Sequence, residues 1–214
     1  MMLNVAAWER RSVVNGPGER FVLWVQGCPF RCPGCYNPAY LPRAGGTPLS
    51  APAVAGLVLA TSGIEGVTYT GGEPMAQARG LSEVSRRVRA AGLSVFCFSG
   101  YTLEELRRSR SRSVHELLGE LDVLVDGRYE AEHSGALPWR GSANQRVHFL
   151  TDRYRHLAAS LQRPGRSVEF IVGRDGFVTT GVFDEAFIER LTRVMAARGA
   201  GAGEPLSDLV EDEP

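Results

Sequence analysis

Three cysteines fall within eight residues of this 214-residue chain, at Cys28, Cys32 and Cys35, and the fourth, Cys97, stands far away in an apolar run. Three thiolates can hold three irons of a cubane [4Fe–4S] cluster. Because full ligation takes four cysteines, the fourth iron then has no protein ligand. A metal centre with an open position can bind and activate a further molecule. The spacing C-x3-C-x2-C therefore indicates an iron–sulfur centre built for chemistry.

A structural zinc site is the main alternative for the same cysteines. It would need a fourth ligand, and zinc sites usually pair their cysteines. Only Cys97 or a histidine (His115, His133, His148 or His156) could supply that ligand, and none stands at finger-like spacing. A disulfide framework is disfavoured, because three clustered cysteines leave one unpaired and no secretory leader precedes them. Cys97 is expected to be a small apolar filler in a buried strand.

Composition narrows the class of protein. The 24 basic and 24 acidic residues cancel, which gives no electrostatic reason to expect a nucleic-acid partner. Every basic residue is arginine, so a Schiff-base lysine, a P-loop lysine and a lysine general base are excluded. No apolar run approaches the length of a membrane span. We therefore expect a cytoplasmic protein with no membrane partner.

Strands and helices are expected to alternate, which predicts a parallel sheet built from βα units. The expected strands are short β-branched or aromatic runs at residues 21–25, 66–70, 94–98 and 121–126. Ser50 is expected to cap a helix that ends near Gly63, and apolar residues within 81–88 share one helical face. Residues 102–105 and 113–116 both have the pattern of a capping box at a helix start.

The alternation of strands and helices changes near residue 151, which suggests an appendage to a single domain. The expected parts are a core of residues 1–150, an extension of residues 151–200 and a disordered acidic tail of residues 201–214. Within the extension the sequence predicts a helix at 153–161, a β-hairpin from 168–172 and 177–180, and a final helix capped by Asp184.

The candidate functional residues follow the strands at their carboxyl ends. The cysteine loop follows the first strand, Gly71-Gly72-Glu73-Pro74 the second, Ser99-Gly100-Tyr101 the third and Asp126-Gly127 the fourth. In α/β sheets ligands bind at that edge. A glycine pair lets the backbone approach a ligand closely, and the Glu73 carboxylate could accept a hydrogen bond from an ammonium group.

Five motifs in order carry a resemblance to a known family. They are Asn15-Gly16-Pro17-Gly18-Glu19-Arg20, Cys32-Pro-Gly-Cys-Tyr-Asn37, Gly71-Gly-Glu-Pro74, Val123-Leu-Val-Asp-Gly-Arg-Tyr129 and Arg140-Gly-Ser-Ala-Asn-Gln145. In this order they resemble the activating enzyme of anaerobic (class III) ribonucleotide reductase, a radical SAM protein similar to the glycyl-radical-enzyme activases. The resemblance covers residues 13–150 or so. It implies a compact partial (βα) barrel, to which the hairpin and final helix are an extension.

The resemblance also implies a reaction. In that superfamily the free iron chelates the amino and carboxylate groups of S-adenosylmethionine (SAM), and one electron from the cluster cleaves the sulfonium to give methionine and a 5′-deoxyadenosyl radical. The family uses this radical to take a hydrogen atom from a glycine of a partner enzyme. A glycyl-radical partner and an electron donor such as flavodoxin or ferredoxin are implied, and no catalytic side chain beyond the cluster and SAM.

Roles carry over from the family to matching positions. The implied iron ligands are Cys28, Cys32 and Cys35, and the implied methionyl-binding loop is Gly71, Gly72, Glu73 and Pro74. The implied cluster-proximal residues are Asn15, Gly16, Gly18 and Arg20. Asp126 would hold a cation or a polar contact near SAM, or is only a turn residue. Tyr36, Ser99 and Tyr101 would contact adenine or ribose, or are core and rim residues.

Two other functions stay open at this point. The chain could direct the same radical at a small metabolite or a ribosomal peptide, because no motif describes the surface that faces the substrate. It could also be a non-enzymatic iron–sulfur or zinc module, which formation of products from SAM would exclude.

Overall fold

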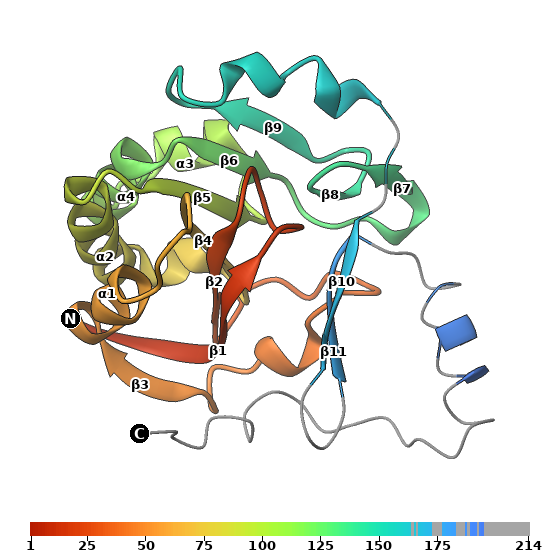
Figure 1. Ribbon diagram of the computed structural model, residues 1–214, viewed down its shortest axis with the longest axis horizontal. Coiled ribbons are helices and arrows are strands. Elements are labelled where there is room, and N and C mark those ends of the chain that lie inside the picture. The colour runs from red at the N-terminus through yellow and green to blue at the C-terminus, as the bar shows by residue number, and fades with distance from the viewer. Residues whose placement is uncertain are drawn as a thin grey trace.

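The computed structural model describes residues 1–163, 165, 167–172 and 177–182, together with residues 187, 189–191, 193 and 194. Its centre is a seven-stranded sheet in the order β3-β1-β2-β4-β5-β6-β9 (Figure 1). The strands are β1 (Met2–Ser12), β2 (Arg20–Val25), β3 (Thr47–Ser50), β4 (Gly66–Gly71), β5 (Ser94–Ser99), β6 (Val123–Asp126) and β9 (Arg146–Phe149).

The four predicted strands form the middle of this sheet. β2, β4, β5 and β6 pair in parallel, so their carboxyl ends meet at one edge. β1 and β3 extend the sheet on one side and β9 on the other, all in antiparallel pairing. In the described residues β3 and β9 are the outer strands of the sheet. The α/β class, with parallel strands at the centre of the sheet, is confirmed.

The helices cover one face of the sheet (Figure 1). They are α1 (Ala51–Leu59), α2 (Ala78–Ala90), α3 (Leu103–Arg108) and α4 (Arg112–Glu120). The Ser50 hydroxyl caps α1, and the box at residues 102–105 caps α3, as predicted. The predicted capping box at residues 113–116 is wrong. Ser113 lies inside α4, which begins one residue earlier, and Glu116 instead pairs with Arg112 at 2.8 Å.

Side chains alternate between the two faces of the parallel strands. Leu23, Tyr69 and Cys97 pair across β2, β4 and β5 and belong to the core that the helices cover. Trp24 and Phe98 belong to smaller clusters on the opposite, inner face. Cys97 has no exposed surface, so the prediction that it is a buried filler is confirmed.

Three strands of the sheet, β1, β3 and β9, were not predicted. β1 buries Leu3, Val5 and Ala7 at alternate positions, which is the pattern of a strand. β3 has no buried residue. β9 follows the Arg140–Gln145 motif directly and has no fully buried residue. All three strands are antiparallel additions to the βα core, so the alternation of strands and helices did not indicate them.

Shorter elements complete the described chain. They are the 3₁₀ helices η1 (Pro38–Tyr40), η2 (Pro74–Gln77), η3 (Ala131–His133), η4 (Arg155–Leu157) and η5 (Ser160–Gln162), and the strand pairs β7 (Ser134–Leu137) with β8 (Arg140–Ser142) and β10 (Val168–Val172) with β11 (Phe177–Gly181). In the described part of the chain, no helix is long and apolar enough to cross a membrane.

The extension differs in part from its prediction. The hairpin is confirmed as β10 and β11. The helix predicted at residues 153–161 is wrong, because two 3₁₀ turns with i→i+3 hydrogen bonds replace it. These turns bring the buried Tyr154 hydroxyl to 2.8 Å from Ser94 on the inner face. The predicted cap at Asp184 and the tail of residues 201–214 lie outside the described residues.

Candidate active site

A cavity of about 220 Å³ opens at the carboxyl ends of β2, β4 and β5. Its walls include the cysteine loop, residues 71–73, residues 99–100 and residues 127–129. Loops far apart in the sequence thus meet at one edge, as the parallel pairing requires. The inner-face side chains Trp24 and Phe98 form part of the lining.

The cysteine loop leaves β2 and folds back on itself. The Gly27 N–H donates to the Tyr40 carbonyl at 2.9 Å, and the Cys28 N–H donates to the Leu41 carbonyl at 3.0 Å. A further bond of 3.2 Å joins the Cys35 N–H to the Cys32 carbonyl. All three cysteines line the cavity and are half-buried. Their thiols are therefore held together on one ordered loop and remain accessible from the cavity.

Burial and backbone N–H groups act in opposite directions on the pKa of the Cys28 and Cys35 thiols. Burial raises the pKa of Cys28 to about 11, the backbone N–H of Phe30 opposes this rise, and Glu73 and the other two cysteines add to it. Burial also raises the pKa of Cys35, against a backbone N–H of Asn37. Metal binding removes the thiol protons, and N–H groups directed at the sulfurs help to tune an iron–sulfur cluster.

The donor set fits a cluster better than a single zinc ion. Zinc–sulfur bonds of about 2.3 Å in a tetrahedral site place the sulfurs about 3.8 Å apart. Among the described residues, the group whose ligand atoms all lie within 4.8 Å of one another is Glu130, Glu132 and His133, and not the three cysteines. The described lining of the cavity also contains no histidine and no fourth cysteine. Three spaced thiols with no histidine or fourth cysteine beside them match a cluster with one open iron.

The glycine pair is required by close packing of the backbone. Gly71 has a φ of 99°, and a Cβ there would lie 2.7 Å from the Val25 nitrogen. A Cβ on Gly72 would overlap the carbonyl oxygen of Gly27, next to the first cysteine. Both glycines also line the cavity. They therefore bring the end of β4 against the start of the cysteine loop while leaving backbone groups at the cavity wall.

Glu73 is a buried carboxylate that joins the ends of β4 and β5. Its Oε1 accepts from the Met75 N–H at 2.8 Å and from the Ser99 hydroxyl at 2.9 Å, and its Oε2 accepts from the Gly100 N–H at 2.8 Å. Burial raises its pKa to about 7 against these three donors. Pro74 begins η2 and lies outside the cavity lining. The carboxylate therefore braces the loops that surround the cavity.

The aromatic candidates divide into two groups. Tyr36 lines the cavity, and its ring packs against that of Tyr129 with centroids 4.9 Å apart. A Cβ on Gly141 would lie 3.1 Å from both rings. Ser99 lines the cavity, but its hydroxyl is engaged with Glu73. Tyr101 is not part of the lining and packs on the Phe30 ring at 4.7 Å.

Asp126 is not part of the lining of this cavity, and its contact near SAM stays a prediction. Its carboxylate, which has no exposed surface, accepts from the Leu103 N–H at 2.6 Å and pairs with Arg146 at 2.8 Å. His148 Nε2 lies 3.0 Å away. Burial alone would raise its pKa, but these partners outweigh burial and lower it to about 2. Asp126 therefore ties β9 and α3 to the end of β6.

The residues predicted to lie near the cluster are found in different parts of the structure. Asn15 lines the cavity, whereas Gly16, Gly18 and Arg20 do not. Arg20 is at the amino end of β2, opposite the cysteine loop. It is fully buried and donates to Thr68 Oγ1 at 2.8 Å, among other acceptors. The six-residue strand β2 separates Arg20 from the cysteine loop, and its place near the cluster stays a prediction.

Other residues of the lining were missed. Trp139, with φ of 61°, stands edge-on to Phe96 at 5.4 Å. Gln145 accepts from the Gly141 N–H at 2.8 Å and donates to the Gly127 carbonyl at 2.9 Å, which fixes one wall of the cavity. Both belong to the stretch around the Arg140–Gln145 motif, so the motif was the available signal. The hairpin β10–β11 also contributes, and its sequence carried no signal for this position.

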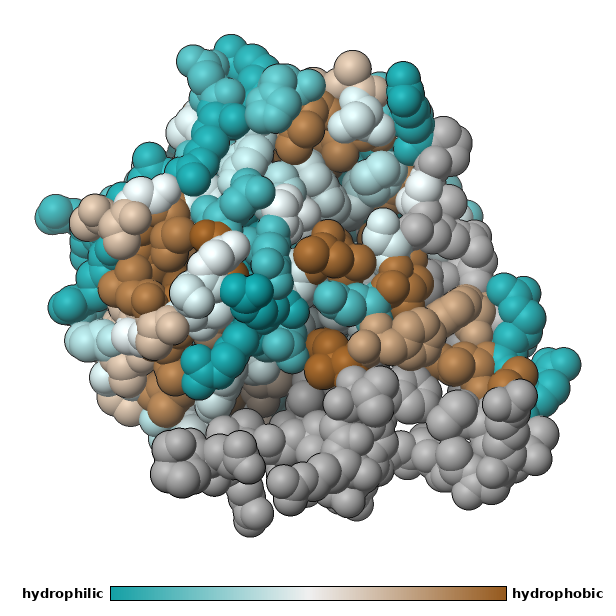
Figure 2. All heavy atoms as spheres, in the orientation of Figure 1, coloured by the Kyte–Doolittle hydropathy of each residue, from teal (hydrophilic) through white to brown (hydrophobic). Residues whose placement is uncertain are grey.

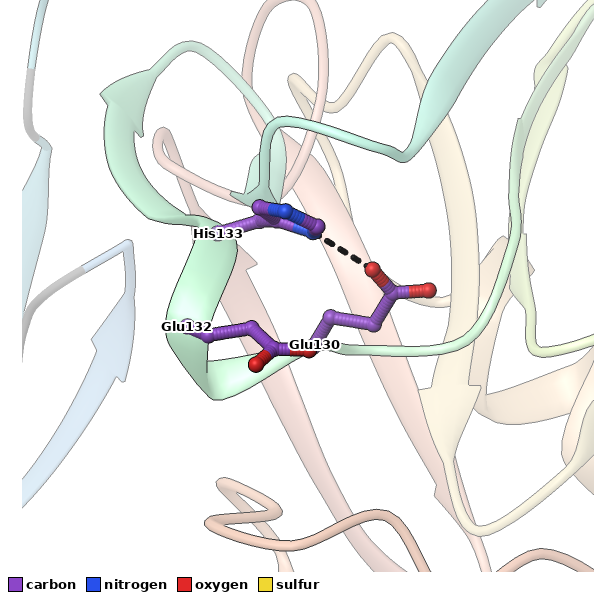
Figure 3. A group of neighbouring side chains, drawn as sticks. All are labelled: Glu130, Glu132 and His133. Carbon is purple, nitrogen blue, oxygen red and sulfur yellow. Dashed lines mark hydrogen bonds and ion pairs between the residues drawn. The ribbon is translucent and has the colours of Figure 1, made fainter.

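A second cluster of possible metal ligands lies near η3 (Figure 3). His133 Nδ1 is 2.5 Å from a carboxylate oxygen of Glu130, and Glu132 stands nearby. The side chains of Glu130 and His133 are 42% and 54% exposed. None of the three lines the cavity. The contact is a hydrogen bond between two solvent-exposed side chains next to the cavity wall.

Comparisons with known proteins agree with this site. Residues 14–148 match the family described as 4Fe-4S single cluster domain. The anaerobic ribonucleoside-triphosphate reductase-activating protein of Enterobacteria phage T4 is 36% identical over 146 residues, which cover 65% of this chain and 89% of that protein. The protein of the same name from Vibrio cholerae is 36% identical over 149 residues, covering 65% and 94%.

A third relative of the same name, from Pasteurella multocida, is 33% identical over 159 residues, covering 70% of this chain and 99% of its own length. Among solved structures, QueE from Escherichia coli is similar over 48% of this chain and 54% of its own, with a TM-score of 0.36 and 17% identity. The assignment below rests on the family match and the named relatives.

The open α/β sheet, the three cysteines at its carboxyl edge and the single-cluster match define an iron–sulfur enzyme of the radical SAM class, with a [4Fe–4S] cluster and SAM as cofactors. The chain belongs to the family of the anaerobic ribonucleoside-triphosphate reductase-activating proteins. The family resemblance in the sequence is thereby confirmed, and a non-enzymatic module is set aside.

Proposed function

We propose that this chain activates a glycyl-radical ribonucleotide reductase by taking a hydrogen atom from a glycine Cα of that partner. The observation that carries the proposal is the meeting of three half-buried cysteines with residues 71–73 and 99–100 around one cavity. The shared name of the relatives supports the choice of partner.

Cys28, Cys32 and Cys35 are the proposed iron ligands. The bound cluster and SAM together supply a reductive cleavage that yields methionine and a 5′-deoxyadenosyl radical. The chain keeps the three sulfurs on one hydrogen-bonded loop, and the N–H groups of Phe30 and Asn37 are directed at two of them. Leaving one iron without a protein ligand gives SAM a place to bind.

The other walls of the cavity have proposed roles toward SAM. Residues 71–73 present backbone groups to its methionyl end, and Glu73 holds their geometry through its bonds to Ser99 and Gly100. The rings of Tyr36 and Tyr129 offer an aromatic surface for its adenine. Ser99 contributes by fixing the loop after β5, because its hydroxyl is engaged with Glu73.

The partners follow from the chemistry. With the cluster and SAM bound, the 5′ carbon would take a hydrogen atom to give 5′-deoxyadenosine, and the glycine Cα would keep the unpaired electron. The electron for SAM cleavage comes from a small carrier protein such as a flavodoxin or a ferredoxin. The cytoplasm is the proposed location, since a reducing compartment preserves the thiols. The zero net charge gives no reason to add a nucleic-acid or membrane partner.

The test is to incubate the reduced, cluster-loaded protein with SAM and a glycyl-radical reductase from the same genome. The proposal predicts a glycyl doublet in the EPR spectrum that requires all three components. A Cys32→Ala variant serves as the control and gives no doublet. Formation of 5′-deoxyadenosine without a doublet from any candidate reductase would contradict the choice of target.

A small metabolite or a peptide is the second candidate for the radical's target. The observation that favours it is the hairpin β10–β11, whose residues 179–182 form part of the wall of a cavity of about 220 Å³. Such a wall restricts the space available to a protein loop. Production of 5′-deoxyadenosine that depends on an added metabolite or peptide, with no glycyl signal, would support this candidate.

A further inference from the structure

The hairpin β10–β11 stands beside the proposed radical site. Residues 179–182 of β11 and the turn after it line the same cavity as the three cysteines. In Figure 1 the hairpin lies next to the loop that carries the cysteines. It lies beyond residues 14–148, the segment that matches the family. The hairpin is therefore a feature of this chain that is added to a site built from the family's segment.

Thr180 anchors the hairpin to the core. Its side chain is buried, with 7% of the residue exposed, and so is that of Asn15. The Asn15 amide donates to Thr180 Oγ1 at 2.9 Å, and Thr180 Oγ1 lies 3.3 Å from Asn15 Oδ1 as a donor in return. These two side chains are 165 positions apart in the sequence. A reciprocal side-chain contact thus joins β11 to the segment before β2.

The anchor continues into the inner face of the sheet. The Asn15 carbonyl accepts from Thr68 Oγ1 at 2.7 Å. The same oxygen of Thr68 accepts from Arg20 Nε at 2.8 Å. Both Thr68 and Arg20 are fully buried. A continuous chain of hydrogen bonds therefore runs from the hairpin to the buried centre of the sheet, which holds the wall in one position.

The base of the hairpin packs closely against neighbouring backbone. Gly181 has a φ of 116°, and a Cβ there would overlap the carbonyl oxygen of Ser167 and lie 3.2 Å from Val14. The Val182 N–H donates to the Ser167 carbonyl at 2.9 Å. Figure 2 shows hydrophobic side chains gathered over the hairpin and beside it, and the exposed Phe170 belongs to β10. The glycine thus permits the close approach that seals this side of the cavity.

We propose that the hairpin β10–β11 is a shielding wall that makes the radical site selective, by excluding small hydrogen donors from the Asn15 side of the cavity. The inference rests on the proposed function. A carbon radical takes a hydrogen atom from any donor that reaches it. A small thiol would give its S–H hydrogen, form 5′-deoxyadenosine and become a sulfur-centred radical, so the glycine of the partner would remain unchanged.

The experiment uses the full, cluster-loaded chain with Thr180→Val, which keeps the shape of the side chain and removes its hydroxyl. Gly181→Ala is the second variant, because it displaces the base of the hairpin. Thr151→Val is the matched control, since Thr151 Oγ1 donates to Asp122 at 2.7 Å away from the cavity. Two quantities are measured. One is the amount of 5′-deoxyadenosine formed per glycyl radical in the presence of dithiothreitol, and the other is the rate of iron loss to EDTA.

The proposal predicts that both quantities rise about fivefold in Thr180→Val, the effect of losing about 1 kcal/mol of anchoring hydrogen bond. Gly181→Ala is expected to show at least the same rise, and Thr151→Val is expected to match the wild type. Wild-type values in both hairpin variants would contradict the proposal that the hairpin shields the site. Iron loss needs no partner, so it still tests the wall if the wild type produces no glycyl radical and the proposed function itself fails.

Discussion

The alternation of side chains along β5 decides which cysteines can act together. Cys97 points toward the helices and belongs to the core that they cover. The three clustered cysteines instead line the cavity at the carboxyl ends of the strands. The sequence showed the separation only as distance along the chain. The structure adds the physical reason, because successive residues of a strand point to opposite faces.

The ligand assignment can be tested by replacing each cysteine separately. Cys28→Ala, Cys32→Ala and Cys35→Ala are each expected to lose the cluster, since two thiolates cannot hold the cubane that three hold. Cys97→Ala is expected to keep its full iron content and a reduced EPR signal that changes when SAM is added. Iron analysis and EPR after anaerobic reconstitution make the comparison. Equal loss of iron in Cys97→Ala would mean a closed site with four cysteines.

Glu73 gives the cluster-free protein a pH dependence of its own. Its pKa is raised by burial to about 7 from 4.5, so the folded state holds the proton over a range in which the unfolded state has lost it. Protonated Glu73 makes its full contribution to the free energy of unfolding below pH 4.5. This contribution falls by about 3 kcal/mol as the pH rises from 4.5 to 7. Urea unfolding at a series of pH values measures this fall.

Glu73→Gln is expected to remove that slope, because glutamine does not titrate. Glu116→Gln, on α4, is the control and should keep the wild-type slope. Asp126 does not interfere, because its pKa is lowered to about 2 and its contribution is lost only as the pH falls below 3.8. A wild-type slope in Glu73→Gln would show that another group titrates in this window.

At the scale of elements, the site depends on how closely β4 approaches the end of β2. The glycine pair is predicted to contact the methionyl group of SAM. The Cβ positions of Gly71 and Gly72 also meet the backbone of residues 24–27. The pair therefore positions the cysteine loop as well as lining the cavity.

This packing leads to a prediction for Gly72→Ala. The added methyl group would overlap the Gly27 carbonyl, so we expect a loss of about 1–3 kcal/mol in the free energy of unfolding, together with a lower iron content. Gly56→Ala is the matched control. Gly56 lies on α1 with nothing within 4 Å of its Cβ position, and the change should stabilise the protein by about 0.5–1 kcal/mol. Normal stability and iron in Gly72→Ala would contradict the close packing.

The elements also show what the sequence could predict. The four parallel strands, the capped helices α1 and α3 and the meeting of the motif loops follow from local patterns and from the βα rule. The brace from Gln145 to Gly127 and the contact from Asn15 to Thr180 join distant segments through side-chain amides. No local pattern encodes such contacts, so these walls of the cavity became known only from the structure.

At the scale of the whole molecule, the extension completes the inner face that the helices leave uncovered. The Tyr154 hydroxyl lies 2.8 Å from Ser94 and 3.3 Å from Glu65, close to the buried Arg20. The hairpin covers the same face near the cavity. The division into a core of residues 1–150 and an extension of residues 151–200 stays a prediction, although the described part of that extension packs on the core.

The origin of the hydrogen atom added to 5′-deoxyadenosine is the most direct test of whether this chain takes a hydrogen atom from a glycine of a reductase. A glycyl-radical reductase labelled with deuterium at its glycine Cα positions is incubated with the reduced, cluster-loaded protein and SAM, and the 5′-deoxyadenosine is analysed by mass spectrometry. Deuterium is expected to enter the 5′-deoxyadenosine as the glycyl EPR doublet appears. Unlabelled 5′-deoxyadenosine, formed at the same rate with or without the reductase, would contradict it.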